Sequence, residues 1–212
     1  MNSRELVHIL LAVIVMAFAV SFINISQPGF STDFLLAALF FIVIFIFSIG
    51  AKKLAAYYLQ SDTETKIWQF QRYGLYERSY FKKPIPIGFL LPFILSILTL
   101  GRFPWLATTQ TEIQASKSRV AKRHGIYRFS EMTDSDMAWI TGAGIFVPLV
   151  LAVIAYLINL PNLSKYAILF ASFNMIPLGN LDGSKIFFGS RVLWTILAVL
   201  CLIGLGYIFL LI

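Results

Sequence analysis

The sequence predicts an all-α polytopic membrane protein with a re-entrant hairpin and small interfacial β elements. Of its 212 residues, 58% are hydrophobic and only 13% are charged, whereas a soluble domain has roughly 25% charged residues. Stretches without Asp, Glu, Lys or Arg recur along the chain, and a helix needs roughly 20 apolar residues to cross a bilayer. These runs lack the alternation of barrel strands. We therefore expect a single membrane domain over residues 1–212.

The apolar runs predict five helices, near residues 6–26, 34–59, 139–158, 165–178 and 191–212. Residues 108–116 read as a short strand. The aromatic segment 65–82 is either a hairpin turning at Tyr73-Gly74 or an interfacial helix, because its alternation is imperfect. Ser130 or Thr133 is expected to cap the helix that runs through Trp139, since acidic residues follow in its first turn.

The segment 84–107 is rich in Pro and Gly, and the basic residues decide how it meets the membrane. Lys and Arg concentrate on the cytoplasmic side of membrane proteins. A spanning segment would divide the 17 Lys and Arg residues almost evenly between the two sides, whereas a re-entrant segment leaves only Lys165 outside. We therefore expect five crossings, a re-entrant segment 84–107 and cytoplasmic segments 60–83 and 108–138. Irregular backbone at membrane depth implies a protein-lined cleft.

The net charge of +7 indicates contact with lipid headgroups rather than with nucleic acid. The basic residues flank apolar runs, where they attract anionic lipids, and no nucleic-acid-binding motif accompanies them. The expected partner is the lipid bilayer, and the protein is an integral, multi-pass membrane protein.

The residues 173–187, FNMIPLGNLDGSKIF, resemble the Asn-x-x-Pro…Leu-Asp-Gly element of intramembrane zinc proteases of the site-2 type. The stretch 43–58, VIFIFSIGAKKLAAYY, resembles the helix that carries the HExxH motif in that family. The resemblance implies a site-2 protease-like helical core, in which two His residues and the Asp of the Leu-Asp-Gly element bind zinc. The Glu of HExxH would act as general base on a zinc-bound water.

This chain departs from the family at the motif itself, where it reads Ser48-Ile49-Gly50-Ala51-Lys52. Ser48 and Lys52 stand at the two His positions, and Ile49 stands at the Glu position. Only Asp182 survives of the ligand positions, and a catalytic zinc needs about three protein ligands. The two histidines, His8 and His124, show no ligand-like spacing. We therefore expect no catalytic residues, no metal ligand set and no cofactor.

Four residues form the residual site that the resemblance implies: Lys52, Asn174, Pro177 and Asp182. The second His and the Asp of the family bind one metal, so their side chains converge. Since an intramembrane charge is costly unless it is paired, we predict that Lys52 and Asp182 form an ion pair; the alternative is that Lys52 extends to the headgroups. Asn174 either bonds a neighbouring helix or, with Pro177, retains the family's peptide-binding role.

The function expected from these residues is that of a catalytically inactive relative, a pseudoprotease, which binds transmembrane segments or partner proteins. Two alternatives remain. One is an active intramembrane metalloprotease with atypical ligands. The other is an unrelated membrane scaffold or small transporter, because function must be argued from the site and not from the fold.

Overall fold

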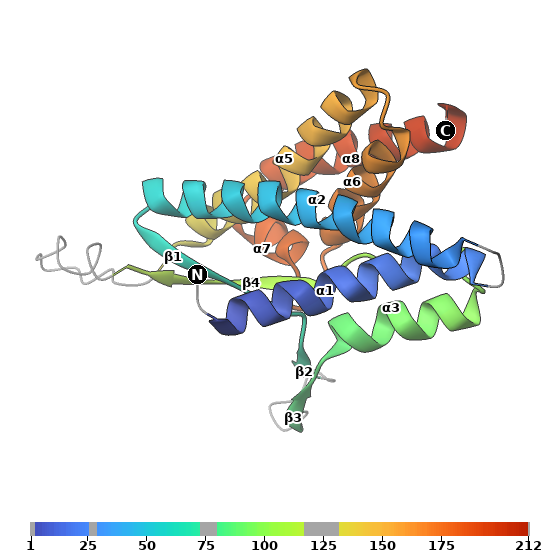
Figure 1. Ribbon diagram of the computed structural model, residues 1–212. Helices are drawn as coiled ribbons and strands as arrows, with labels where there is room; N and C mark the ends of the chain where they lie inside the picture. The colour runs from blue at the N-terminus through green and yellow to red at the C-terminus, as the bar shows by residue number, and fades with distance from the viewer. Residues whose placement is uncertain (1–2, 26–28, 73–79, 117–131, 212) are drawn as a thin grey trace, which may run out of the picture.

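The computed structural model describes residues 3–25, 29–72, 80–116 and 132–211 of the protein (Figure 1). Helices dominate, and four strands form two small sheets. The helices are α1 (Ser3–Ser21), the 3₁₀ turn η1 (Phe22–Asn24), α2 (Phe30–Tyr58), α3 (Ile87–Leu98), α5 (Asp134–Leu157), α6 (Pro161–Asn174), α7 (Asp182–Gly189) and α8 (Arg191–Leu211). The strands are β1 (Ser61–Ile67), β2 (Phe70–Arg72), β3 (Tyr80–Ile85) and β4 (Thr109–Ala115).

Four helices in the described ranges are long and apolar enough to cross a bilayer: α1 extended by η1, α2, α5 and α8. They coincide with four of the five helices that hydropathy predicts. The fifth, expected at 165–178, is α6, which begins four residues earlier because Pro161 starts its first turn. With 14 residues α6 is shorter than a bilayer crossing, so the fifth crossing stays a prediction.

The helices pack in two layers (Figure 1). In one layer α1 lies between α2 and α3. In the other, α5, α6 and α8 pack on one another, and α2 joins the layers by contacting α1, α5 and α6. The short helix α7 packs against α5 and α8. It begins where the Leu-Asp-Gly element stands, so this packing places Asp182 between α2 and α5.

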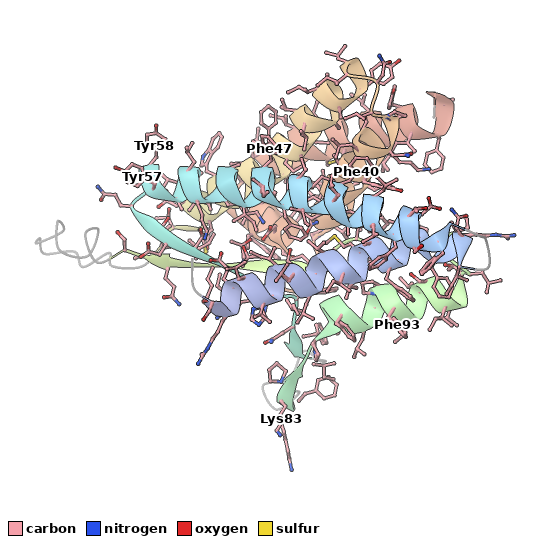
Figure 2. The ribbon with its side chains drawn as sticks, viewed as in Figure 1. Phe40, Phe47, Tyr57, Tyr58, Lys83 and Phe93 are labelled. Carbon is pink, nitrogen blue, oxygen red and sulfur yellow. The ribbon has the colours of Figure 1, made fainter. Side chains whose placement is uncertain are left out.

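Small residues allow these helices to approach closely. Ala17, Ala152 and Ala167 are buried in the main core, where they surround the fully buried ring of Phe41. The outward faces are apolar as well, and Phe47 and Phe93 stand away from their helices (Figure 2). An apolar core inside an apolar surface is the arrangement of a helical membrane protein, in which lipid replaces water around the helices.

The strands confirm the expected β elements. β1 and β4 pair antiparallel from Ser61↔Ala115 to Ile67↔Thr109, so the strand predicted at 108–116 is present. The segment 65–82 contains the antiparallel pair β2 and β3 and is therefore a hairpin rather than a helix. Its expected Tyr73-Gly74 turn lies outside the described residues. Of the two candidate caps, Thr133 accepts a hydrogen bond from the backbone of Asp136, and Ser130 lies outside the described residues.

The segment 84–107 leaves the β-sheets and returns to the same residue. The backbone N–H of Trp68 donates to the carbonyl oxygen of Thr108 at 2.8 Å, and the Trp68 carbonyl accepts from the N–H of Gly88 at 2.9 Å. A Cβ atom at Gly88 would overlap with the backbone of both Thr108 and Trp68, so this close approach requires glycine. Both ends of the segment therefore lie side by side, as a re-entrant hairpin requires.

The first half of this proline-containing segment is helical. Residues 87–98 form α3, and Pro92 lies inside the helix. Past α3, Gly101 lies against the backbone of Ile23 at the far end of α1. Arg102 consequently lies at the opposite end of α1 from its first residues.

Candidate functional site

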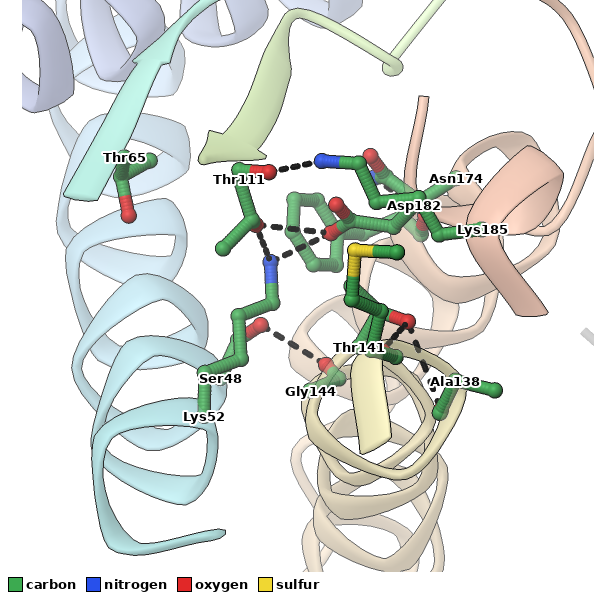
Figure 3. Close-up of polar contacts among 12 residues, drawn as sticks. Ser48, Lys52, Thr65, Thr111, Ala138, Thr141, Gly144, Asn174, Asp182 and Lys185 are labelled. Atoms are coloured by element: carbon green, nitrogen blue, oxygen red, sulfur yellow. Dashed lines mark hydrogen bonds and ion pairs between the residues drawn. The ribbon is translucent and has the colours of Figure 1, made fainter. Parts of the chain in front are cut away.

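A buried ion pair joins α2 to α7 (Figure 3). The Nζ atom of Lys52 lies 2.5 Å from Oδ2 of Asp182, and only 5% and 1% of their side-chain surfaces are exposed. Lys52 therefore does not extend to the surface, and the predicted pairing of these residues is confirmed. The two helices come from positions 130 residues apart in the chain, so the contact is a tertiary link.

Strand β4 supplies the third member of the cluster. The hydroxyl of Thr111 accepts a hydrogen bond from Lys52 Nζ at 3.0 Å and donates to Asp182 Oδ2 at 3.2 Å. Its backbone carbonyl accepts from the ammonium group of Lys185, one turn after Asp182 on α7. Figure 3 shows Thr111 between the two lysines. Three elements thus meet at one polar cluster, which we call the Lys52 cluster: Lys52, Thr111, Asp182 and Lys185.

The first position of the degenerate motif serves packing. The Ser48 hydroxyl is buried and donates to the backbone carbonyl of Gly144 on α5 at 2.7 Å. A Cβ atom at Gly144 would overlap with the aliphatic part of the Lys52 side chain. Ile49 is buried in the main core among α1, α2 and α6. Ser48 therefore holds α2 against α5, and the absence of a side chain at Gly144 leaves room for the Lys52 side chain.

The electrostatics of the cluster favour an ionised carboxylate. Asp182 and Lys185 lie on α7, outside the four candidate spans. Burial alone raises the pKa of the Asp182 carboxyl, but the ammonium groups of Lys52 and Lys185 outweigh burial and bring that pKa below its usual value. Burial lowers the pKa of Lys185, and the attraction of Asp182 opposes that shift only in part. Two cationic side chains thus share one buried carboxylate.

The other two residues of the expected site do not join the cluster. Asn174 is buried at the end of α6, and its Nδ2 donates to Phe170 within the same helix at 2.8 Å. Its Oδ1 has no partner among the described residues, so the expected bond to a neighbouring helix is not observed. Pro177 lies in the exposed stretch 177–180 between α6 and α7. Asn174 and Pro177 therefore lie in the segment 174–181, which leads from the end of α6 to the cluster residue Asp182.

A zinc ion of the kind that the resemblance implies does not fit these side chains. Oδ2 of Asp182 already accepts from Lys52 and Thr111, and an ammonium group repels a dication. The described residues contain no group of three His, Cys, Asp or Glu side chains placed to hold a metal, whereas a catalytic zinc takes three protein ligands. The polar atoms present here can hold charge and hydrogen bonds, but they lack a metal-binding geometry.

A second ion pair, in which only the carboxylate is buried, was not predicted from the sequence. Lys53, the neighbour of Lys52, donates to Oε2 of Glu5 on α1 at 2.9 Å, and the other Glu5 oxygen accepts from the backbone of Thr65 at 3.3 Å. Thr111 and Lys185 were also missed. Adjacent lysines at the end of a membrane helix are a signal for Lys53, since each must find a partner or reach the headgroups. No sequence pattern singles out Thr111.

A scan against protein-family models and searches of curated proteins and of solved structures found no match for this chain. The likeness to site-2 proteases therefore rests on the residues quoted above.

Proposed function

We propose that this protein is a catalytically inactive, site-2 protease-like membrane protein that binds transmembrane segments of partner proteins. The observation that carries the proposal is the Lys52–Asp182 ion pair. It joins two helices at the positions where the resembled family shares a metal, and one of its two side chains, the Lys52 ammonium group, repels zinc. Breaking one partner of such a pair costs on the order of 3–5 kcal/mol, so the pair can hold the scaffold together in place of a metal.

The segment that leads from α6 to Asp182 supports a binding role. Residues 177–180 are exposed and follow Asn174, whose Oδ1 is unsatisfied among the described residues. Gly179 packs beside the indole of Trp68, and the Nε1 atom of Trp68 is likewise without a described partner. Buried polar groups usually find partners. Both atoms are buried, so we assign the contact with a locally extended peptide segment to the exposed, irregular strip 177–180 itself.

Site-specific photo-crosslinking in native membranes tests this proposal. A photoreactive residue at Leu178, which is exposed beside the cluster, should capture membrane proteins that carry a transmembrane segment, and these should remain uncut. The matched control is Leu35 on α2, which is also exposed but lies far from α7 in sequence and structure. Equal capture at Leu178 and Leu35 would contradict a binding site at the cluster.

Zinc analysis of the purified protein separates the inactive relative from an active enzyme. The proposal expects no stoichiometric zinc, and no dependence of metal content on residue 182. Stoichiometric zinc that is lost in Asp182→Asn, together with cleavage of a captured partner, would favour a metalloprotease with atypical ligands.

A further inference from the structure

A cavity of about 920 Å³ lies apart from the Lys52 cluster. One wall is formed by α6 and α8, and the other by the end of α1 and the tip of the hairpin at residues 101–104. Neither Lys52 nor Asp182 lines it. Its volume is near the upper end of the range for small-ligand sites, roughly 300–1,000 Å³. Most of its lining is apolar, including Leu169 on α6 and Leu205 on α8.

Its polar residues belong to helix ends that lie near one another. Asn24 ends η1, and Arg102 follows Gly101, which lies against Ile23. Lys165 lies in the first turns of α6. Asp33 connects these parts, because its carboxylate accepts from Asn24 at 2.9 Å and acts electrostatically on Tyr166, the neighbour of Lys165. The cavity is therefore amphipathic, with its charged groups gathered toward one end.

The charge at that end is net positive, because Arg102 and Lys165 outnumber the neighbouring carboxylate of Asp33. Neither Arg102 nor Lys165 forms an ion pair with any residue in the part of the chain that the structure describes. Asp33 uses its Oδ2 on Asn24. Arg102 comes from the hairpin wall and Lys165 from the α6 wall. Two cations on opposite walls of an apolar cavity complement a ligand with an anionic head and an apolar tail.

We propose that this cavity binds an anionic membrane phospholipid. Its phosphate lies at the end lined by Arg102 and Lys165, and an acyl chain follows α6 and α8 toward Pro177. Charge favours an anionic lipid over an apolar transmembrane helix, because two cations line one end of the cavity. The lipid site meets the partner-binding strip 177–180 at Pro177, which lines the cavity, but its charged end at Arg102 and Lys165 lies outside that strip.

Native mass spectrometry of the purified full chain tests the proposal, with phosphatidylglycerol and phosphatidylcholine added separately. The protein should retain one phosphatidylglycerol in preference to phosphatidylcholine. The double variant R102Q/K165Q should lose the preference, by roughly fivefold for each cation removed. The matched control is K82Q/K83Q, which removes the same charge from exposed residues of β3 outside the cavity; Lys83 points away from the helices (Figure 2). This control should bind like the parent protein.

The acyl chain is tested by filling the cavity without changing its charge. Ala198→Phe and Leu202→Trp place bulk on the α8 wall, and whichever variant keeps the parent's elution profile should lose the bound lipid. Inorganic phosphate should not displace the lipid, because it lacks the apolar chain. Equal loss of preference in K82Q/K83Q would reduce the effect to general surface attraction. Full lipid retention in the filled variants, or displacement by phosphate, would overturn the proposal.

Discussion

At the scale of single residues, Lys52 stands at a metal-ligand position of the resembled family and also links two other elements of the fold. The Lys52 ammonium group stands where the resembled family has a metal-binding ring, and it bonds both Asp182 and Thr111. The ion pair followed from the sequence because the two family positions converge on one metal. Thr111 and Lys185 could not be predicted, because their contribution depends on how β4 and α7 approach α2. A buried charge without a partner is costly, and this applies to both Lys52 and Asp182.

Because Lys185 also interacts with Asp182, removing Lys52 and removing Asp182 should affect stability unequally. In Lys52→Met, the Asp182 carboxylate keeps Lys185 within electrostatic range. In Asp182→Asn, the buried Lys52 and the partly buried Lys185 both lose the carboxylate that they share, and only Lys185 keeps an anion, Glu112, within electrostatic range. We therefore expect Asp182→Asn to lower the free energy of unfolding more than Lys52→Met, with the larger loss on the order of 3–5 kcal/mol.

Thermal unfolding in detergent measures the two single variants and the double variant. The double variant should lose less than the sum of the single losses, because residues in contact are coupled. Lys83→Met, which removes an exposed lysine, should change stability little. Additive losses from Lys52→Met and Asp182→Asn would show that the pair contributes no coupling.

At the scale of elements, hydropathy predicts the long helices well, but it predicts neither α3 nor the way the helices pack together. The expected runs lie within a few residues of α1, α2, α5 and α8, since a long charge-free stretch in a membrane protein has few structures open to it. α3 was missed because four prolines in 84–107 argue against a helix. The second of them, Pro86, immediately precedes α3, and Pro92 is tolerated within it. Sequence periodicity gives no account of why α2 and α5 pack at Gly144.

Two glycines in the long helices provide a matched test of that packing. A Cβ atom at Gly144 would overlap with the Lys52 side chain, whereas one at Gly50 would meet nothing within 4 Å. Gly144→Ala should destabilise the protein by about 1–3 kcal/mol, the usual cost of overpacking. Gly50→Ala should be neutral or stabilising by up to about 1 kcal/mol, because alanine favours the helix.

The unfolding midpoints of the two alanine variants, measured in the same detergent, check this expectation. Similar midpoints for Gly144→Ala and Gly50→Ala would mean that the Lys52 side chain moves aside for a methyl group at little cost. That result would argue against a fixed path for the lysine side chain between α2 and α5.

At the scale of the whole molecule, the charge distribution predicted that segment 84–107 returns to the side it started from. The structure brings its two ends together at Trp68. The sequence could not indicate how far the segment reaches. Its tip lies beside Ile23, and this contact depends on α3 packing along the length of α1.

Cysteine labelling in intact membranes tests this topology, in a chain whose native thiol is removed by Cys201→Ala. Lys83→Cys and Gln114→Cys flank the hairpin at exposed positions and should react from the same side. Arg102→Cys, at the tip, should react from the opposite side. Reaction of the two flanking cysteines from opposite sides would show that the segment crosses the bilayer once, and would remove the topological support for the family resemblance.

The hydrogen bonds of Trp68 have an evolutionary consequence. Because the chain departs from and comes back to one residue, the register of β1 with β4 is independent of what lies between Gly88 and Thr108. Insertions and deletions in that interval would leave the strands, and Thr111 with them, in place. Relatives of this protein can therefore differ in the length of this excursion while the lysine, the threonine and the aspartate stay in contact.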